Sequence, residues 1–502
     1  MRRREFIALA SGLAALPATA GWPQVAEAPS LKATARALAG RPHVPASRPL
    51  PPPFAGLDYD AYRGIRPIPG KAAMLPLGTT HAADLLPPGL FFPDPVRVEL
   101  ASEQGPSEIP FSPTLFSFDP RYFGSVPDDA PGAGFSGVRL RHPLNAPDLM
   151  DEFLVIQGAS YFRAIGKGMV YGLSCRAIAL GTGGPGPEEF PRFTHLRVHA
   201  PRPDGVRVEA LIDAPSLTGY ADMRVRPGEE TEADVSVTIF PRVGIDDIGI
   251  APLTSMYLKG PLRASVSDDF RPRVHDSDVL FVENGRGERL WRPVSNPARL
   301  QTSAFVDDGP AAFGLYQTER GFDGFEDAEA QYHMRPSCSV RPAGDWGEGA
   351  VMLVEIPTGD EFMDNVVAFW RPAAPLAAGG EYRFDYRLVW TLAPPAQQGP
   401  AAILTTRSGR EHDRPGTLRY VIDFAGDPEG MRPEIALSGP GAEVSGESLF
   451  PLPVPGRFRT TFLLTPGEAE AAELRLQLRD RDGRPASPVW LHRWTRARDG
   501  GV

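Results

Sequence analysis

Tyr382-Arg-Phe-Asp-Tyr-Arg-Leu-Val-Trp390 places an aromatic or aliphatic side chain at every second position. Arg383, Asp385 and Arg387 occupy positions between them. Successive residues of a β-strand face opposite sides, so this pattern predicts a strand with one buried face and one face in water. Such half-solvated strands are typical of antiparallel sheets.

The same alternation recurs along the chain. Apolar residues alternate with other residues from Val208 to Ile212 and from Val235 to Ile239, and strand-like runs return at Leu418–Phe424 and Leu474–Leu478. The 52 glycines and 56 prolines exceed one fifth of the 502 residues, which favours many short strands separated by turns. Short helices are predicted only at 31–38 and 323–332. The sequence therefore predicts an all-β protein.

The chain is too long for one compact core, so we expect more than one domain. A short Pro-rich segment, Ala393-Pro-Pro-Ala-Gln-Gln-Gly-Pro400, reads as a linker. We predict a large β-sandwich over residues 55–391, a linker over 392–401 and a small β-sandwich over 402–502. Residues 21–54, rich in Ala and Pro, read as a mostly extended lead-in.

The first twenty residues have the features of an export signal. Three arginines precede an apolar run from Ile7 to Leu16, and Ala18-Thr-Ala20 fits a cleavage site. Arg3-Arg4-Glu5-Phe6 matches a twin-arginine signal, although an Arg-rich ordinary secretory signal would look similar. We expect a periplasmic protein with no integral membrane segment, since no later run is long and apolar enough to span a bilayer.

Charge and motif content exclude several functions. A net charge of −10 without a later basic cluster argues against a nucleic-acid partner. His195 and His199 lack the intervening glutamate and third ligand of a zinc site, so we expect no metal and no cofactor. The two cysteines, Cys175 and Cys338, are too few for a disulfide scaffold; they either form one disulfide or remain two buried thiols.

Two acidic clusters are candidates for catalysis. His275-Asp276-Ser277-Asp278 lies in a strand-rich region, and Glu361-Phe-Met-Asp364-Asn365 lies between two apolar strands. Glycoside cleavage needs one carboxyl group that holds a proton and one that is ionised. The alternative is that Asp, Asn and Ser simply form turns at these positions.

Aromatic side chains could stack on sugar rings near these acids. Their competing assignment is the hydrophobic core. The candidates are Tyr161, Phe162, Tyr257, Trp291, Trp346 and Trp370.

Several longer runs resemble a known family, the periplasmic glucan biosynthesis proteins of the G and D types. The resemblance extends from about residue 55 to 390, and the signal resembles the D type. The runs that carry it are Gln157-Gly-Ala-Ser-Tyr-Phe-Arg-Ala-Ile-Gly-Lys-Gly168, Gly249-Ile-Ala-Pro-Leu-Thr-Ser-Met-Tyr257, Asp269-Phe-Arg-Pro-Arg-Val-His-Asp-Ser-Asp278 and Asp364-Asn-Val-Val-Ala-Phe-Trp370.

The resemblance implies a galactose-mutarotase-like β-sandwich followed by an immunoglobulin-like β-sandwich. It also implies an inverting endo-β-1,2-glucanase that trims the glucan backbone, with Asp364 as general acid, Asp276 as general base and Glu361 as a supporting carboxylate. The residues expected to bind the β-1,2-linked glucan are Tyr161, Arg163, Lys167, Tyr257, His275, Trp291, Trp346 and Trp370.

Two other functions stay open. A non-catalytic scaffold that binds glucan would use the same acids to hydrogen-bond sugar hydroxyls, and a sugar epimerase would pair His275 with Asp276. A homodimer and contact with the glucan synthesis machinery are further partners to consider. Val279, Glu348, Ala328 and the run Gln317-Thr-Glu-Arg-Gly321 differ from the residues usual in the family, so the detail of the site is open.

Overall fold

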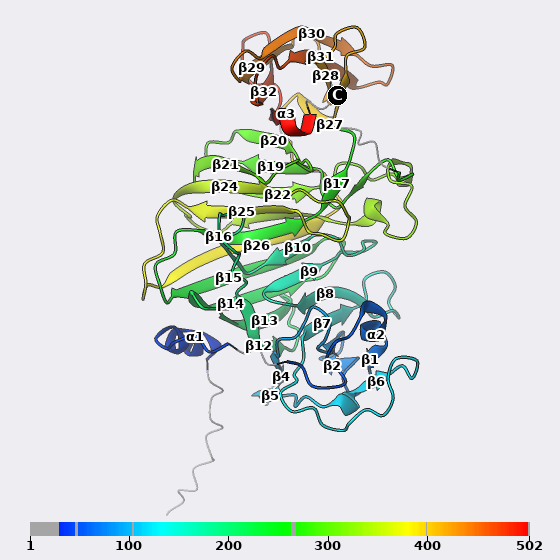
Figure 1. Ribbon diagram of the computed structural model, residues 1–502, viewed down its shortest axis with the longest axis vertical. Coiled ribbons are helices and arrows are strands. Elements are labelled where there is room, and N and C mark those ends of the chain that lie inside the picture. The colour runs from blue at the N-terminus through cyan, green and yellow to red at the C-terminus, as the bar shows by residue number, and fades with distance from the viewer. Residues whose placement is uncertain (1–29, 46–48, 103–104, 263–267, 398, 500–502) are drawn as a thin grey trace, which may run out of the picture.

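The computed structural model describes residues 30–45, 49–102, 105–262, 268–397 and 399–499. Within these residues, two large sheets of eleven and fourteen strands dominate the molecule, which confirms the all-β prediction. Figure 1 shows the sheets layered in the centre, with the C-terminal strands at one end and the N-terminal strands β1 to β8 at the other. The predicted signal at residues 1–20 lies outside the described residues.

The eleven-stranded sheet combines seven strands from residues 75–180 with four strands from residues 248–372. Strand β11 (Ile178–Leu180) pairs with β16 beside the main order. That order is β2 (Leu75–Leu77), β3 (His81–Leu86), β7 (Gly137–His142), β8 (Asp151–Gln157), β9 (Tyr161–Ala164), β10 (Ser174–Arg176), β16 (Ile248–Ser255), β25 (Val366–Pro372), β24 (Glu348–Glu355) and β21 (Gln301–Asp308).

The fourteen-stranded sheet includes β26 (Tyr382–Thr391), which contains the alternating run Tyr382–Trp390. In β26, Phe384, Tyr386, Leu388 and Trp390 are buried, whereas Arg383 and Arg387 are exposed, as the alternation predicts. The order is β29 (Arg432–Ser438), β32 (Ala471–Arg479), β33 (Val489–Thr495), β20 (Arg289–Pro293), β19 (Val279–Glu283), β22 (Ala312–Tyr316), β23 (Ser337–Pro342), β26 (Tyr382–Thr391), β15 (Thr231–Pro241), β14 (Leu217–Arg226), β13 (Val206–Asp213), β12 (Arg192–His199), β4 (Arg97–Ser102) and β5 (Gly105–Glu108).

The main core lies between these two sheets. Leu253 and Trp370 of the first sheet and Leu388 and Trp390 of the second belong to one buried cluster. Burying a large aromatic or aliphatic side chain contributes about 1.5–3 kcal/mol each, so the sandwich gives the loops at its edges a rigid support.

The C-terminal residues form a second sandwich. Strands β29, β32 and β33 face a four-stranded sheet, and β33 also pairs in parallel with β20, so the two sandwiches share one continuous sheet. Trp291 of β20 lies in the same buried cluster as Trp490 of β33. The four-stranded sheet consists of β27 (Ala401–Arg410), β28 (Leu418–Gly426), β31 (Arg457–Thr465) and β30 (Glu443–Pro451).

Helices are short in the described residues. The predicted helix at 31–38 is confirmed as α1 (Leu31–Ala39), which packs Leu31 and Ala35 against Tyr220 and Phe240. The predicted helix at 323–332 is wrong, because this segment holds only two 3₁₀ turns separated by an irregular loop. The remaining elements are α2 (Tyr59–Arg63), α3 (Arg496–Asp499), the 3₁₀ turns η1 (Pro113–Leu115), η2 (Phe322–Gly324) and η3 (Tyr332–Met334), and the paired strands β1 (Ile65–Pro67) with β6 (Phe116–Phe118) and β17 (Tyr257–Lys259) with β18 (Val274–His275).

In the part of the chain that the structure describes, no helix has the length and hydrophobicity needed to cross a bilayer.

Candidate functional site

Two anchors bring the acidic clusters to one place. Asn365 is fully buried; its side chain accepts a hydrogen bond from the Tyr257 amide (2.8 Å) and donates to the Tyr257 carbonyl (3.1 Å). Tyr257 in turn pairs with His275 across β17 and β18. The residue before Asn365 is Asp364 and the residue after His275 is Asp276, so these contacts hold the backbone at both acids beside the same pair of strands.

Asp364 lines a pocket of about 350 Å³ together with Tyr161, Arg163, Phe91 and Phe92. Its side chain remains 37% exposed, and Arg163 Nη2 lies 3.8 Å from its Oδ2. Burial raises the pKa of Asp364 above its ordinary value; Arg163 opposes the shift and the charge of Asp276 adds to it. A carboxyl group in this setting retains a proton to higher pH than a surface aspartate.

Asp276 is the more enclosed of the two carboxylates, with 3% of its surface exposed. Arg335 Nη1 donates to its Oδ1 at 2.6 Å. The Arg335 guanidinium also lies over the ring of Tyr332, 4.2 Å from the centroid. This charge-assisted hydrogen bond fixes the orientation of the Asp276 carboxylate.

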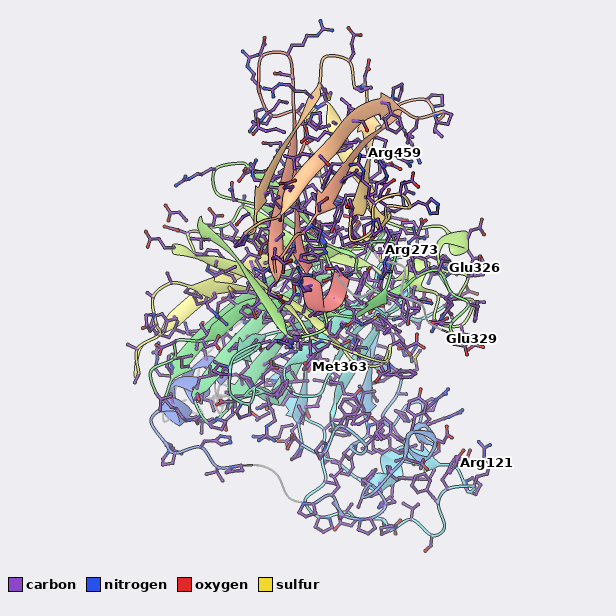
Figure 2. All side chains as sticks on the ribbon, turned by 45° about the horizontal axis from the view of Figure 1, so that its top comes forward. Arg121, Arg273, Glu326, Glu329, Met363 and Arg459 are labelled. Carbon is purple, nitrogen blue, oxygen red and sulfur yellow. The ribbon has the colours of Figure 1, made fainter. Side chains whose placement is uncertain are left out.

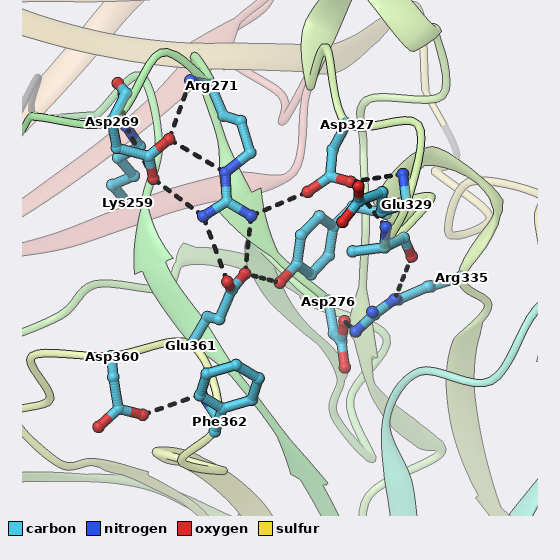
Figure 3. Close-up of polar contacts among 12 residues, drawn as sticks. Lys259, Asp269, Arg271, Asp276, Asp327, Glu329, Arg335, Asp360, Glu361 and Phe362 are labelled. Atoms are coloured by element: carbon cyan, nitrogen blue, oxygen red, sulfur yellow. Dashed lines mark hydrogen bonds and ion pairs between the residues drawn. The ribbon is translucent and has the colours of Figure 1, made fainter. Parts of the chain in front are cut away.

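Glu361 belongs to a second set of ion pairs, drawn in Figure 3. Arg271 donates to Glu361 (2.8 Å), Asp327 (2.8 Å) and Asp269 (3.0 Å), and the Tyr332 hydroxyl donates to Glu361 at 2.5 Å. Burial acts to raise the pKa of Glu361, but the hydrogen bonds from Arg271 and Tyr332 outweigh it and leave the pKa lowered. Glu361 is therefore an ionised carboxylate that Arg271 and Tyr332 hold in place.

A connected path follows from these contacts. Glu361 holds the hydroxyl of Tyr332, the ring of Tyr332 lies under Arg335, and Arg335 holds Asp276. Figure 3 shows Arg271 between its three acids and Arg335 against Asp276. In Figure 2, Arg273, Glu326 and Glu329, neighbours of this network in sequence, lie along one flank of the large sandwich.

The segment from Tyr332 to Arg335 is held from behind by two side chains of one short stretch. Gln317 is 1% exposed; its side-chain amide donates to the Tyr332 carbonyl and its oxygen accepts from His275 Nδ1 at 3.2 Å. Arg320 donates to the Arg335 carbonyl (2.5 Å). Burial lowers the pKa of the Arg320 guanidinium to about 10.

Five of the predicted substrate-binding side chains are buried, which corrects the prediction. Stacking on a sugar requires an open ring face, and these rings are covered by the core: Trp291 packs among C-terminal side chains, and Trp346 packs against Trp370. His275 is enclosed by Tyr257 and Phe325. The exposed fractions are 3% for Tyr257, 0% for His275, 2% for Trp291, 7% for Trp346 and 0% for Trp370.

The other three predicted residues divide between two places. Tyr161 and Arg163 share the pocket of Asp364, and the Arg176 guanidinium lies 4.6 Å from the centre of the Tyr161 ring. Lys167 instead forms an ion pair with Glu229 at 2.9 Å. Phe162 is also in the core, at 2% exposed.

Sequence reasoning missed Arg335, Tyr332 and Asp327. Asp327 and Tyr332 lie in the segment that was predicted to be a helix, and Arg335 follows it directly after the turn η3; no local pattern marks the three residues as partners of Asp276 or Glu361. Arg271 lay within a run that resembled the family, next to Asp269, but its charge alone did not single it out. The exposed Phe91, 80% accessible beside Asp364, was likewise unmarked.

In the described part of the chain, no three His, Cys, Asp or Glu side chains are grouped so that they could hold a metal ion. His195 pairs with Glu99 (3.0 Å) and His199 with Glu209 (2.7 Å), both on neighbouring strands. These contacts account for both histidines as members of a polar sheet face.

A known protein family matches most of this chain. Residues 27–494 match the family model described as periplasmic glucan biosynthesis protein, MdoG. The chain belongs to this family. As a member, it is a periplasmic protein of glucan biosynthesis.

Curated relatives are named for the G type. A "Glucans biosynthesis protein G" of Vibrio cholerae is 43% identical over 92% of this chain and 85% of its own length. A protein of the same name from Shewanella frigidimarina is 42% identical over 92% of this chain and 83% of its own length. These names correct the resemblance to the D type, which rested on the arginines of the signal.

Two solved structures that are 9% identical in sequence have TM-scores too low to support an inference about this chain. A polysaccharide lyase covers 71% of this chain and 44% of its own with a TM-score of 0.21. A galactose mutarotase related enzyme from Lactobacillus acidophilus covers 51% of this chain and 91% of its own, also with a TM-score of 0.21.

Proposed function

We propose that this protein is an inverting endo-β-1,2-glucanase that shortens the glucan backbone in the periplasm. The observation that carries the proposal is the contrast between two carboxylates anchored to the same pair of strands. Burial raises the pKa of Asp364 beside an open pocket, whereas Asp276 is enclosed and ion-paired with Arg335. Two acids with different environments are what acid–base hydrolysis of a glycosidic bond requires.

In this proposal Asp364 donates its proton to the leaving glycosidic oxygen as the bond breaks. Asp276, held by Arg335, accepts the proton of the attacking water. Glu361 holds Tyr332 and so keeps the ring beneath Arg335 in place. Tyr161 and Arg163 would contact the sugar next to the scissile bond.

The test compares wild type with Asp364→Asn on linear β-1,2-glucan, with new reducing ends as the measurement. We expect the variant to lose turnover by at least about 10²-fold, the lower range for a general acid. Near-wild-type turnover of the variant would remove the acid assignment. A wild-type protein that binds the glucan but never forms reducing ends would be a binding scaffold.

A further inference from the structure

The two cysteines of the chain meet across the main core. Cys175 lies in β10 of the eleven-stranded sheet and Cys338 in β23 of the fourteen-stranded sheet. Their sulfur atoms are 3.8 Å apart, and the side chains are 1% and 0% exposed. We propose that Cys175 and Cys338 form a disulfide bond that ties the two large sheets together behind the candidate site.

One end of this contact supports the Asp364 pocket. Ser174, the neighbour of Cys175 in β10, accepts a hydrogen bond from Arg163 Nε at 2.6 Å. Arg176, the neighbour on the other side, lies over the ring of Tyr161. Strand β10 therefore holds two of the side chains that line the pocket of Asp364.

The other end supports the surroundings of Asp276. Arg335, the partner of Asp276, stands three residues before Cys338. The Ser337 hydroxyl, directly before Cys338, accepts hydrogen bonds from Arg320 Nη2 (2.8 Å) and from the backbone N–H of Gln317 (3.0 Å). A bond between the cysteines would join the two supports of the site covalently.

Formation of the bond requires only a limited movement of the two sulfur atoms. A disulfide has an S–S length of about 2.05 Å, roughly 1.8 Å shorter than the present 3.8 Å separation. The sheets approach closely here, since β16 and β22, the hydrogen-bonded neighbours of β10 and β23, have Cα atoms within 8 Å of each other. Rotation of the two side chains and a small shift of the strands would close the bond.

The chemistry is thiol–disulfide exchange with a protein disulfide oxidant of the periplasm. One cysteine thiolate attacks the oxidant's disulfide, forming a mixed disulfide and releasing one thiol; the second thiolate then displaces the other. The protein's two thiols become one disulfide, and their two protons and two electrons pass to the oxidant, which leaves as a dithiol. Both side chains are buried in the folded protein, so the exchange occurs while the sheets are apart, during folding or in an opened state.

The bond would also stabilise the protein, because it closes a loop between residues 163 positions apart. The exported chain meets an oxidising compartment, where such a bond persists. The inference stands apart from the proposed glucanase activity, since neither the bond nor its effect on stability depends on turnover.

The test begins with the full protein purified from the periplasm and denatured in guanidinium with iodoacetamide. We expect no alkylated cysteine without prior reduction, two after reduction, and a peptide in which Cys175 is linked to Cys338. Two alkylated cysteines in the unreduced sample would overturn the proposal.

Thermal unfolding gives a second readout. Wild type should melt several degrees lower after reduction, whereas the double variant Cys175→Ala, Cys338→Ala should melt at the same temperature with and without reductant. The same wild-type Tm with and without reductant would contradict the proposal, whether or not the double variant folds.

Discussion

Arg163 is the residue through which the proton affinity of Asp364 can be adjusted. It lies 3.8 Å from the carboxylate and is the main influence that opposes the raised pKa. A general acid works while protonated, so a rate that depends on Asp364 falls as pH rises through its pKa. Removing the cation raises that pKa further and should move the falling limb of the profile to higher pH.

We therefore predict that Arg163→Met moves the alkaline limb of kcat/KM upward by about one pH unit, since a charge at about 4 Å contributes about 1 kcal/mol or more. Arg163→Lys, which retains the charge, should leave the limb close to wild type. The measurement is initial rate on β-1,2-glucan across pH. A limb that moves downward in Arg163→Met would contradict the charge relation.

The stretch from Gln317 to Arg320 acts on the element that carries Tyr332 and Arg335. Both side chains bond to backbone carbonyls of that segment, and Gln317 also bonds His275. Through these bonds the stretch supports the segment whose side chains hold Asp276 and Glu361. None of these residues is among those that line the Asp364 pocket. The stretch therefore affects the site through the segment that it supports.

Gln317→Leu should lower kcat by roughly 10-fold or more with a smaller change in KM, because Tyr332 and Arg335 lose their support. It should also lower the free energy of unfolding by about 1–3 kcal/mol, since a buried carbonyl is left without its donor. Gln397→Leu is a matched control: Gln397 makes two hydrogen bonds with the Ile403 backbone, far along the chain from the acids. Equal losses of kcat in both variants would show that stability alone is responsible.

Strands and acidic loops were predictable because both leave a local pattern. The alternation of Tyr382 to Trp390 marks a buried face, and Asp364 follows one apolar strand and precedes another. Whether a tryptophan faces the core or a sugar is decided by residues far away in sequence. Trp291 is covered by the C-terminal strands and Trp370 by the opposite sheet, so no local pattern could exclude them.

The joining of the two sandwiches is a property of the whole molecule. Strand β33 pairs with β20 in parallel, Leu290 opposite Val489 and Trp291 opposite Trp490, and both tryptophans lie in one buried cluster. The sequence predicted two sandwiches and a linker. It could not predict this pairing, because strands two hundred residues apart leave no shared local signature.

Trp291→Ala should therefore destabilise the protein by about 3–5 kcal/mol, the usual cost of a large cavity in a core. Glucan affinity at temperatures well below the transition should stay within about twofold. Guanidinium unfolding and titration calorimetry are the measurements, and Trp291→Phe, which fills most of the space, should lose less stability. Reduced affinity with unchanged stability would return Trp291 to the substrate site.

The proposed activity depends on Asp364 and Asp276 acting together on a β-linked glucan. The most direct test is NMR observation of the first reducing ends released from linear β-1,2-glucan by wild type. Inversion predicts that these ends appear in the α configuration and only later equilibrate. Initial release of the β anomer, or no release at all, would contradict it.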